Sequence, residues 1–242
     1  MPTEPTPSPA PKRPGFDGMA DVLAGLPPEL HPPAPDSPPG RILAAARELY
    51  ATRGISGLST RRLAEAAGVN LSLIHYYFGS KEGLVRAAIR GEILGAMADV
   101  YAGLDSSLPS PELFVQFPIR LLEVLRADAV RLRLLRRVLA TNPERLTRAV
   151  EELGGHGLLG VREVMLKSIA HAQAEEHLPP LPPRSILLFL LSSAYGLILV
   201  APLAEALLGF SLQDDDDWAE HRTQLAQLIS GALGADPHRE VR

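Results

Sequence analysis

Apolar residues recur along this chain at helical spacing, and no segment alternates in the way a half-buried strand does. The first clear example begins after residue 40, where Ile42, Ala46 and Tyr50 fall on one helix face before Gly54 ends the pattern. Three further segments each follow a residue that caps helix N-termini, namely Ser59 or Thr60, Asn70, and Ser80. We therefore predict helices over residues 61–67, 71–77 and 81–102.

The second half of the chain continues as helices that begin with a capping residue followed by proline, because proline is tolerated in the first turn. Such starts occur at 110–112 and 142–144. We expect a helical stretch over 114–140 that breaks near Asp128, and a helix after 142 that the glycines of 154–157 interrupt before it resumes to about 176. Two closing helices are expected over 184–208 and 215–233, so the predicted fold is all-α.

Proline content divides the chain, because residues 1–39 hold 13 of its 23 prolines. We expect this extension to be mostly disordered, with a short amphipathic turn or helix over 16–26. Lys12 and Arg13 are either an arm that reaches DNA or part of a solvated tail. The expected domains are therefore the extension 1–39, a DNA-binding domain over 40–90, and a ligand-binding and dimerisation domain over 91–242.

The segment 60–79 meets the requirements of two short helices that cross steeply. Ala64 supplies the small residue at the crossing, and Gly68 supplies the residue that tolerates a left-handed backbone in the turn. The positions that must be buried are apolar: Leu63, Ala67, Val69, Ile74 and Tyr77. The pattern predicts a helix-turn-helix, and with the preceding helix a three-helix DNA-binding domain.

The second helix of this motif has the layout of a recognition helix. Ile74, Tyr77 and Phe78 fall on one side, whereas Ser72, His75 and Tyr76 fall on the other and should face the major groove. Tyr77 is either packed or in contact with DNA. The residues that we expect to contact bases or phosphates are Thr60, Arg61, Asn70, Leu71, Ser72, His75, Tyr76, Tyr77 and Lys81.

Charge supports the same location for a DNA interface. The chain has a net charge of -4, yet residues 40–90 carry eight basic against three acidic side chains. One basic segment in an acidic protein is expected where a single region meets a polyanion. The absence of cysteine excludes disulfides, and the proline-rich start is unlike a secretion signal, so we expect a cytoplasmic protein.

Residues 41–90 resemble the TetR/AcrR family of bacterial transcriptional regulators. The similarity lies in RILAAARELYATRG and, above all, in LSTRRLAEAAGVNLSLIHYYFGSKEGLV. One departure is that His75 and Tyr76 exchange the order in which the family commonly has tyrosine and histidine. The resemblance implies nine to ten helices, a homodimer, and a repressor that a small-molecule ligand releases from a palindromic DNA operator. Beyond residue 90 the similarity is architectural only.

The uncharged segment 185–204 is long and apolar enough to cross a bilayer. We interpret it instead as a dimer-interface helix, buried partly in its own core and partly against a second copy. A membrane span and an ordinary core helix are the alternatives. The last helix, which starts in the aspartate run 214–217, is expected to be its partner in a four-helix dimer bundle.

Ligand contacts are expected from polar residues within the later helices. The candidates are Tyr101, Gln116, Arg120, Glu123, His156, His171 and Tyr195. His171 and Glu175 have the spacing of a metal pair with His177 nearby, but no third ligand is assured, so we expect no metal and no cofactor. No nucleophile or phosphate-loop motif indicates an enzyme. The alternative function is a helical ligand-binding protein of the same fold without DNA-binding activity.

Overall fold

The computed structural model describes residues 27–55, 59–104, 110–153 and 159–234, and the following statements concern those residues. They form ten α-helices and one short 3-10 helix, without a strand. The elements are η1 (Pro28–Leu30), α2 (Pro38–Arg53), α3 (Thr60–Ala67), α4 (Leu71–Phe78), α5 (Lys81–Ala102), α6 (Ser110–Ala127), α7 (Ala129–Thr141), α8 (Pro143–Leu153), α9 (Leu159–Ala174), α10 (Pro183–Leu208) and α11 (Asp215–Ala232).

The predicted caps fix the helix ends at the N-terminal side of the molecule. Ser59 caps α3, Asn70 caps α4, and Gly68 ends α3 in the left-handed conformation at φ 63°. The first helix starts at Pro38, a few residues earlier than its apolar pattern indicates. It does so because the Ser37 hydroxyl accepts a hydrogen bond from the Gly40 N–H at 3.2 Å, and prolines fit the first turn.

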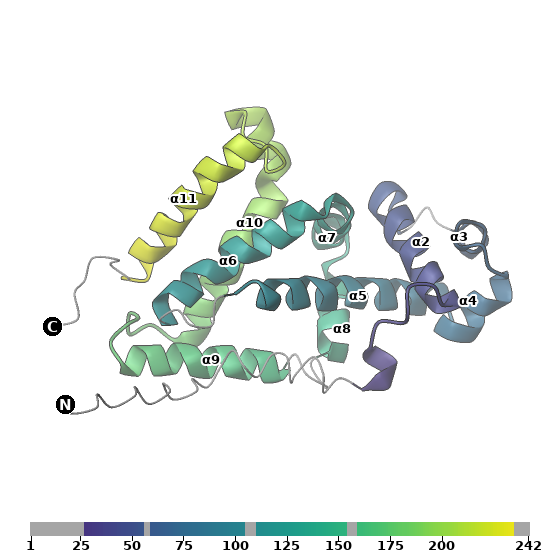
Figure 1. The fold of residues 1–242 in the computed structure, drawn as a ribbon, viewed down its shortest axis with the longest axis horizontal. Coiled ribbons are helices and arrows are strands. Elements are labelled where there is room, and N and C mark those ends of the chain that lie inside the picture. Colours follow the sequence, from purple (N-terminus) through teal and green to yellow (C-terminus); the bar gives the residue numbers. More distant parts are fainter. Residues whose placement is uncertain (1–26, 56–58, 105–109, 154–158, 235–242) are drawn as a thin grey trace, which may run out of the picture.

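The long helix α5 runs from the end that carries α2–α4 into the middle of the molecule (Figure 1). It begins beside α4 and extends to the helices that follow, where it packs against α6, α7 and α8. One hydrophobic core continues through both regions, from Ile42 and Ile74 at the N-terminal end to Ile198 and Ile229 at the other. The three-helix unit α2–α4 is therefore packed onto the rest of the chain, chiefly through α2 against α7.

Part of the proline-rich extension differs from the mostly disordered segment that we expected. Within its described residues, η1 places Leu30 at 9% exposure in a small cluster with Leu94 of α5 and Leu153 of α8. Leu30 is therefore buried although it lies in a proline-rich segment. The low apolar content of that segment gave no sign of this contact. The expected turn or helix over 16–26 and the possible arm at Lys12 and Arg13 lie outside the described residues.

Helix α10 is apolar all round but buried along only one stripe. Ile186, Leu190, Ala194 and Ile198 face the core at i, i+4 spacing. On its other faces large apolar side chains are exposed: Leu188, Phe189, Leu199, Val200, Leu203, Leu207 and Leu208. It is the one helix among the described residues that is long and apolar enough to cross a membrane. Within its apolar 18-residue stretch, 22% of the residues are buried.

Helix α11 packs along α6 rather than beside α10 within the same protomer. Leu225 and Ile229 bury its inner face, and the two helices diverge from their connecting turn (Figure 1). Arg126 at the end of α6 holds that turn, because its guanidinium donates to the Leu212 carbonyl at 3.1 Å and to Asp215 at 2.7 Å and lies over the Trp218 ring. The expected aspartate run thus caps α11 and anchors its start.

Candidate functional site

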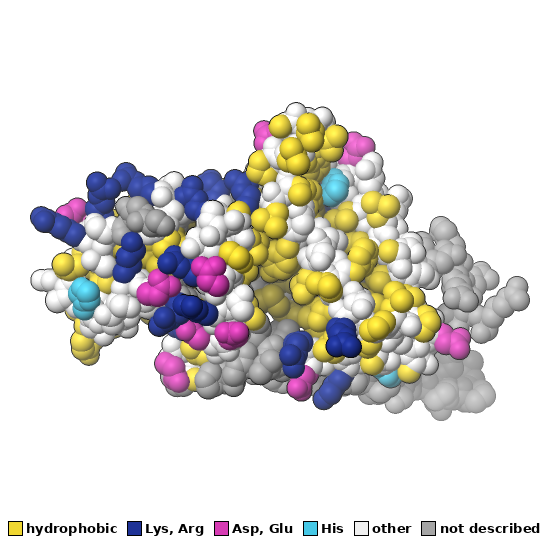
Figure 2. Space-filling view, turned by 180° about the vertical axis from the view of Figure 1, so that it is seen from behind, with side chains coloured by type: hydrophobic (Ala, Val, Ile, Leu, Met, Phe, Trp, Pro, Cys, Tyr) yellow, Lys and Arg dark blue, Asp and Glu magenta, His cyan; other side chains and the backbone are white. Residues whose placement is uncertain are grey.

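The outer face of the helix-turn-helix presents the side chains that a DNA duplex would meet. Ser72, His75 and Tyr76 of α4 are exposed, and Tyr76 is 77% exposed although it is aromatic. Arg61 at the start of α3 has an 84% exposed side chain and contacts only Glu65, at 3.4 Å. Figure 2 shows basic side chains gathered along one edge of the end that carries α2–α4. On this face α4 therefore exposes hydroxyl, imidazole and aromatic groups, and Arg61 of α3 adds a cation.

Two of the predicted contacts also stabilise α4 itself. The Asn70 carbonyl oxygen accepts hydrogen bonds from the Ser72 N–H and from the Ser72 hydroxyl, each at 3.0 Å. The His75 ring lies 3.4 Å from the Gly79 carbonyl, so one ring nitrogen faces its own helix end. Among the predicted contacts on α4, the exposed side chains of Leu71 and Tyr76 make no such polar contact within the helix. Thr60 and Lys81, at the first positions of α3 and α5, are both half-buried.

Tyr77 and Val69 are less buried than the helix-turn-helix pattern indicates. Tyr77 is 42% exposed, with its ring 4.9 Å edge-on from that of Tyr76, and Val69 is half-buried. Ile74 alone is fully buried on α4, and Tyr77, three residues further, lies roughly 60° around the helix from it. Tyr77 therefore sits at the edge of the buried stripe, where it joins the exposed surface.

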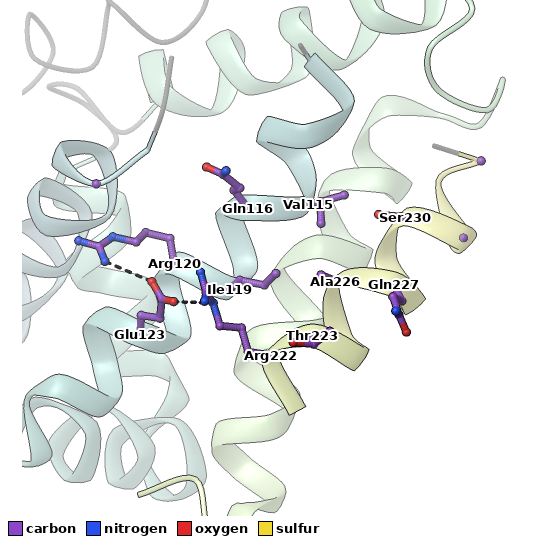
Figure 3. Close-up of a pocket in the computed structure, with 13 residues that line it drawn as sticks. Val115, Gln116, Ile119, Arg120, Glu123, Arg222, Thr223, Ala226, Gln227 and Ser230 are labelled. Atoms are coloured by element: carbon purple, nitrogen blue, oxygen red, sulfur yellow. Dashed lines mark hydrogen bonds and ion pairs between the residues drawn. The ribbon is translucent and has the colours of Figure 1, made fainter. Parts of the chain in front are cut away.

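A second feature is a groove of about 1050 Å³ that α6 and α11 line together (Figure 3). Arg120 and Glu123 project from α6, and Arg222 reaches across from α11 towards Glu123. Each Glu123 oxygen accepts one guanidinium, at 3.2 Å from Arg120 and 2.9 Å from Arg222. The lining residues are Gly103, Val115, Gln116, Ile119, Arg120, Glu123, Arg222, Thr223, Ala226, Gln227, Ser230, Gly231 and Gly234.

The structure brings together three of the expected ligand contacts, namely Gln116, Arg120 and Glu123. Tyr101 lies elsewhere, beside Phe117 and with its hydroxyl 3.8 Å from the Met165 sulfur, and burial raises its pKa. Burial likewise raises the pKa of Tyr195, which packs against the core from α10. The remaining candidates are His171, which is exposed and pairs with Glu175, and His156, which lies outside the described residues.

The metal pair considered from spacing does not gain a third ligand in the described part of the chain. Glu175 lies between His171 and His177, at 3.4 Å from a ring nitrogen of each. All three side chains are roughly half exposed, and no group of three metal-binding residues is formed among the described residues. The arrangement is an exposed polar cluster.

An ion-pair network connects the helix-turn-helix end to the remaining helices. Glu92 of α5, whose side chain is only 10% exposed, accepts from Arg47 of α2 at 2.8 Å and from Arg131 of α7 at 3.2 Å. Arg47 also pairs with Asp128, and Arg131 with Asp99 at 2.8 Å. Burial alone would raise the pKa of the Asp128 carboxyl, but the Arg131 backbone N–H and the Arg47 guanidinium together hold it below its usual range.

Comparison with known proteins shows which family has a similar helix-turn-helix region. Residues 42–88 match the family model described as bacterial regulatory proteins, tetR family. The helix-turn-helix region of this chain is therefore similar to that of the tetR family. The match covers α2, α3, α4 and the start of α5, so it coincides with the helix-turn-helix and its flanking helices. The predicted all-α fold with an N-terminal helix-turn-helix is confirmed.

Individual proteins similar to this chain differ from it considerably in sequence, and the solved structures among them share its fold. The transcriptional repressor KstR2 of Rhodococcus jostii is 33% identical over 87 residues, which are 32% of this chain and only 43% of KstR2. GusR of Salmonella enterica is 21% identical with a TM-score of 0.61, covering 85% of this chain and 99% of its own. FadR of Bacillus subtilis, solved with stearoyl-CoA, is 15% identical with a TM-score of 0.63, covering 80% and 98%.

Two parts of the site were not foreseen from the sequence. The α11 side of the groove was assigned wholly to a dimer bundle, although Arg222, Ala226 and Ser230 recur at i, i+4 spacing and form a stripe of their own. The Glu92 network joins residues 32 to 81 positions apart in the chain, and no local pattern signals such a pairing.

Proposed function

We propose that this chain is a DNA-binding transcriptional regulator that grips a palindromic operator as a homodimer and loosens its grip when a small molecule binds. The observation that carries the proposal is the outer face of the helix-turn-helix, where Ser72 and Tyr76 are exposed and Arg61 extends into solvent. A recognition helix reads bases with such side chains while neighbouring cations hold phosphates. Repression is the action of KstR2, the named relative, and comes to this chain as part of the proposal.

The exposed apolar face of α10 supports the homodimer. Leu203, Leu207 and Leu208 are between 57% and 80% exposed, which is costly for a soluble protein unless a partner covers them. Figure 2 shows apolar side chains over the projecting corner that α10 and α11 form. Because an operator palindrome requires two recognition helices about one DNA turn apart, a second copy is the partner that the function needs. The protein would then be soluble and act in the cytoplasm.

A ligand can control such a dimer only through a difference in its affinity for two arrangements of the recognition helices. The groove between α6 and α11 is placed to provide that difference. It is formed partly by α11, which continues from the proposed dimer helix α10, and partly by α6, which packs against α5. Since α5 starts beside the recognition helix, a change in the groove has a short structural route to the DNA interface.

The proposal is tested by selecting binding sites from a duplex library with a randomised centre and measuring affinity for the enriched site across a salt series. We expect a palindromic consensus, and a wild-type salt slope that Arg61→Ala and Lys81→Ala each reduce by about 0.9 for one lost phosphate contact. Arg162→Ala removes an exposed charge from α9 and should leave the slope unchanged. Ser72→Ala should change the preferred sequence instead.

The same experiment separates the alternative function. A protein that enriches no sequence, and whose weak DNA binding is equal in the Arg61→Ala and Arg162→Ala variants, is not a regulator of this kind. That result would favour the alternative function, a helical ligand-binding protein without DNA-binding activity. Catalysis would need a separate test.

A further inference from the structure

The groove between α6 and α11 has a charge balance that specifies the chemistry of its ligand. Its only ionisable side chains are Arg120, Glu123 and Arg222, so among the described lining residues two cations face one anion. Each of the two arginines uses one N–H donor to contact Glu123. Each guanidinium has five N–H donors, so most of the donors remain for another acceptor.

One of those donors has no protein partner. The Nε atom of Arg120 is buried, and no acceptor among the described residues lies within hydrogen-bonding reach of it. A buried donor without a partner costs free energy until an acceptor satisfies it. Arg120 lies against the C-terminal end of α5, where a Cβ atom on Gly103 would collide with its guanidinium, so the glycine leaves the space that the arginine occupies.

The remainder of the groove suits an extended organic body rather than a bare ion. Val115, Ile119 and Ala226 provide apolar surface, and Gln116, Thr223 and Gln227 provide neutral hydrogen-bonding groups. The volume of about 1050 Å³ is at the upper end of the range for small-molecule sites. In Figure 3, Ile119 and Val115 extend towards α11, away from the Arg120 end.

We propose that this groove binds an amphipathic carboxylate, whose anionic end lies between Arg120 and Arg222 and whose apolar body lies along Ile119 and Ala226. The inference rests on the proposed function in taking this ligand to be the effector. A single carboxylate matches the net charge of the groove, and it accepts two parallel N–H donors from one guanidinium. A phosphomonoester carries nearly twice that charge and would be left partly uncompensated.

The ligand chemistry is tested with a matched pair of fluorescent probes, dansyl-labelled undecanoate and its primary amide, titrated into the full chain. We expect the carboxylate to bind at least about tenfold more tightly than the amide, a difference in keeping with one charge-assisted, bidentate pair. Arg222→Gln should reduce that preference to near unity, since its side chain is 58% exposed and its removal spares the fold. Arg184→Gln, an exposed arginine of α10 outside the groove, should leave it intact.

Two results overturn the inference. The first is equal affinity for the two probes, or binding of neither, in the wild type. The second is a carboxylate preference that survives in Arg222→Gln. Competition by inorganic phosphate that displaces the probe in the wild type more effectively than acetate does would replace the carboxylate with a phosphate ligand.

This test is independent of DNA binding, so its failure is distinguishable from failure of the proposed function. Loss of the carboxylate preference in a protein that selects an operator refutes the ligand class alone. Carboxylate binding that depends on Arg222, in a protein that selects no operator, refutes the regulator alone. If both hold, adding the carboxylate probe to the operator complex should lower DNA affinity in the wild type and not in Arg222→Gln.

Discussion

Replacing Glu92 with glutamine should loosen the attachment of the helix-turn-helix to the rest of the molecule. The substitution keeps the size of the side chain but removes its charge and turns one acceptor oxygen into a donor that faces a guanidinium. Two charge-assisted hydrogen bonds are affected, those from Arg47 and Arg131. A hydrogen bond to a charged group contributes about 1.5–3 kcal/mol.

The expected loss lies towards the lower end of that range for each bond, because neither arginine is left without a carboxylate. Arg47 keeps Asp128 and Arg131 keeps Asp99. We therefore expect Glu92→Gln to lower the free energy of unfolding by about 3 kcal/mol. Urea denaturation at neutral pH measures this as a shift of the midpoint, and Glu163→Gln, an exposed glutamate of α9, is the matched control.

A loss below about 1 kcal/mol for Glu92→Gln would refute the reasoning, because it would place the pair in the range of solvent-exposed ion pairs. A double-mutant cycle with Asp128→Asn adds a second check. Both carboxylates share Arg47, so the two substitutions should be non-additive. If the losses simply add, the side chains do not act as one network.

Three further predictions follow from burial and exposure. Leu207→Glu, at a position that is 72% exposed, should turn the proposed homodimer into a folded monomer in sedimentation velocity, whereas an unchanged dimer would move the proposed interface away from α10. Burial beside Phe210 and Trp218 lowers the pKa of His221, so stability should be lost as the pH falls from about 6.5 through that lowered pKa, and the difference in urea midpoint between pH 7.5 and pH 5 should shrink in His221→Gln. Leu30→Ala should cost about 2 kcal/mol of unfolding free energy, and no measurable cost would show that η1 is not attached to α5 and α8.

Local chemistry explains why so much of the fold was predictable. Helix ends are set by residues next to one another in sequence, so Ser59, Asn70 and Ser80 each marked a start that the structure retains. The break expected near Asp128 is also present, and there Asp128 caps α7. The outward face of α4 followed from helical periodicity in the same way. Only Tyr77 was left undecided between packing and DNA contact, because the burial of a residue at the edge of a buried stripe depends on how closely the neighbouring helix approaches.

Features that depend on which helices meet could not be derived in this way. The groove requires α11 to lie along α6. The i, i+4 stripe of α11 marks one face of that helix but does not specify which other helix the face meets. For the same reason Gln116, Arg120 and Glu123 were expected as ligand contacts without the α11 residue Arg222 that completes them. Glu92 looked like one acidic residue among many, since its burial arises only when α2 and α7 close over α5.

Because Arg126 holds the α10–α11 turn, α11 would tilt about its N-terminal end. The guanidinium fixes the start of the helix at Leu212 and Asp215, whereas the groove extends along the helix as far as Gly234. An 18-residue helix is about 27 Å long, so a tilt of roughly 5° about its fixed start displaces its far end by about 2 Å. The Arg222–Glu123 contact is close to the fixed start of α11 and would barely lengthen. The end of the groove near Gly234 would open. Ligand length, more than ligand charge, would therefore set how far α11 swings.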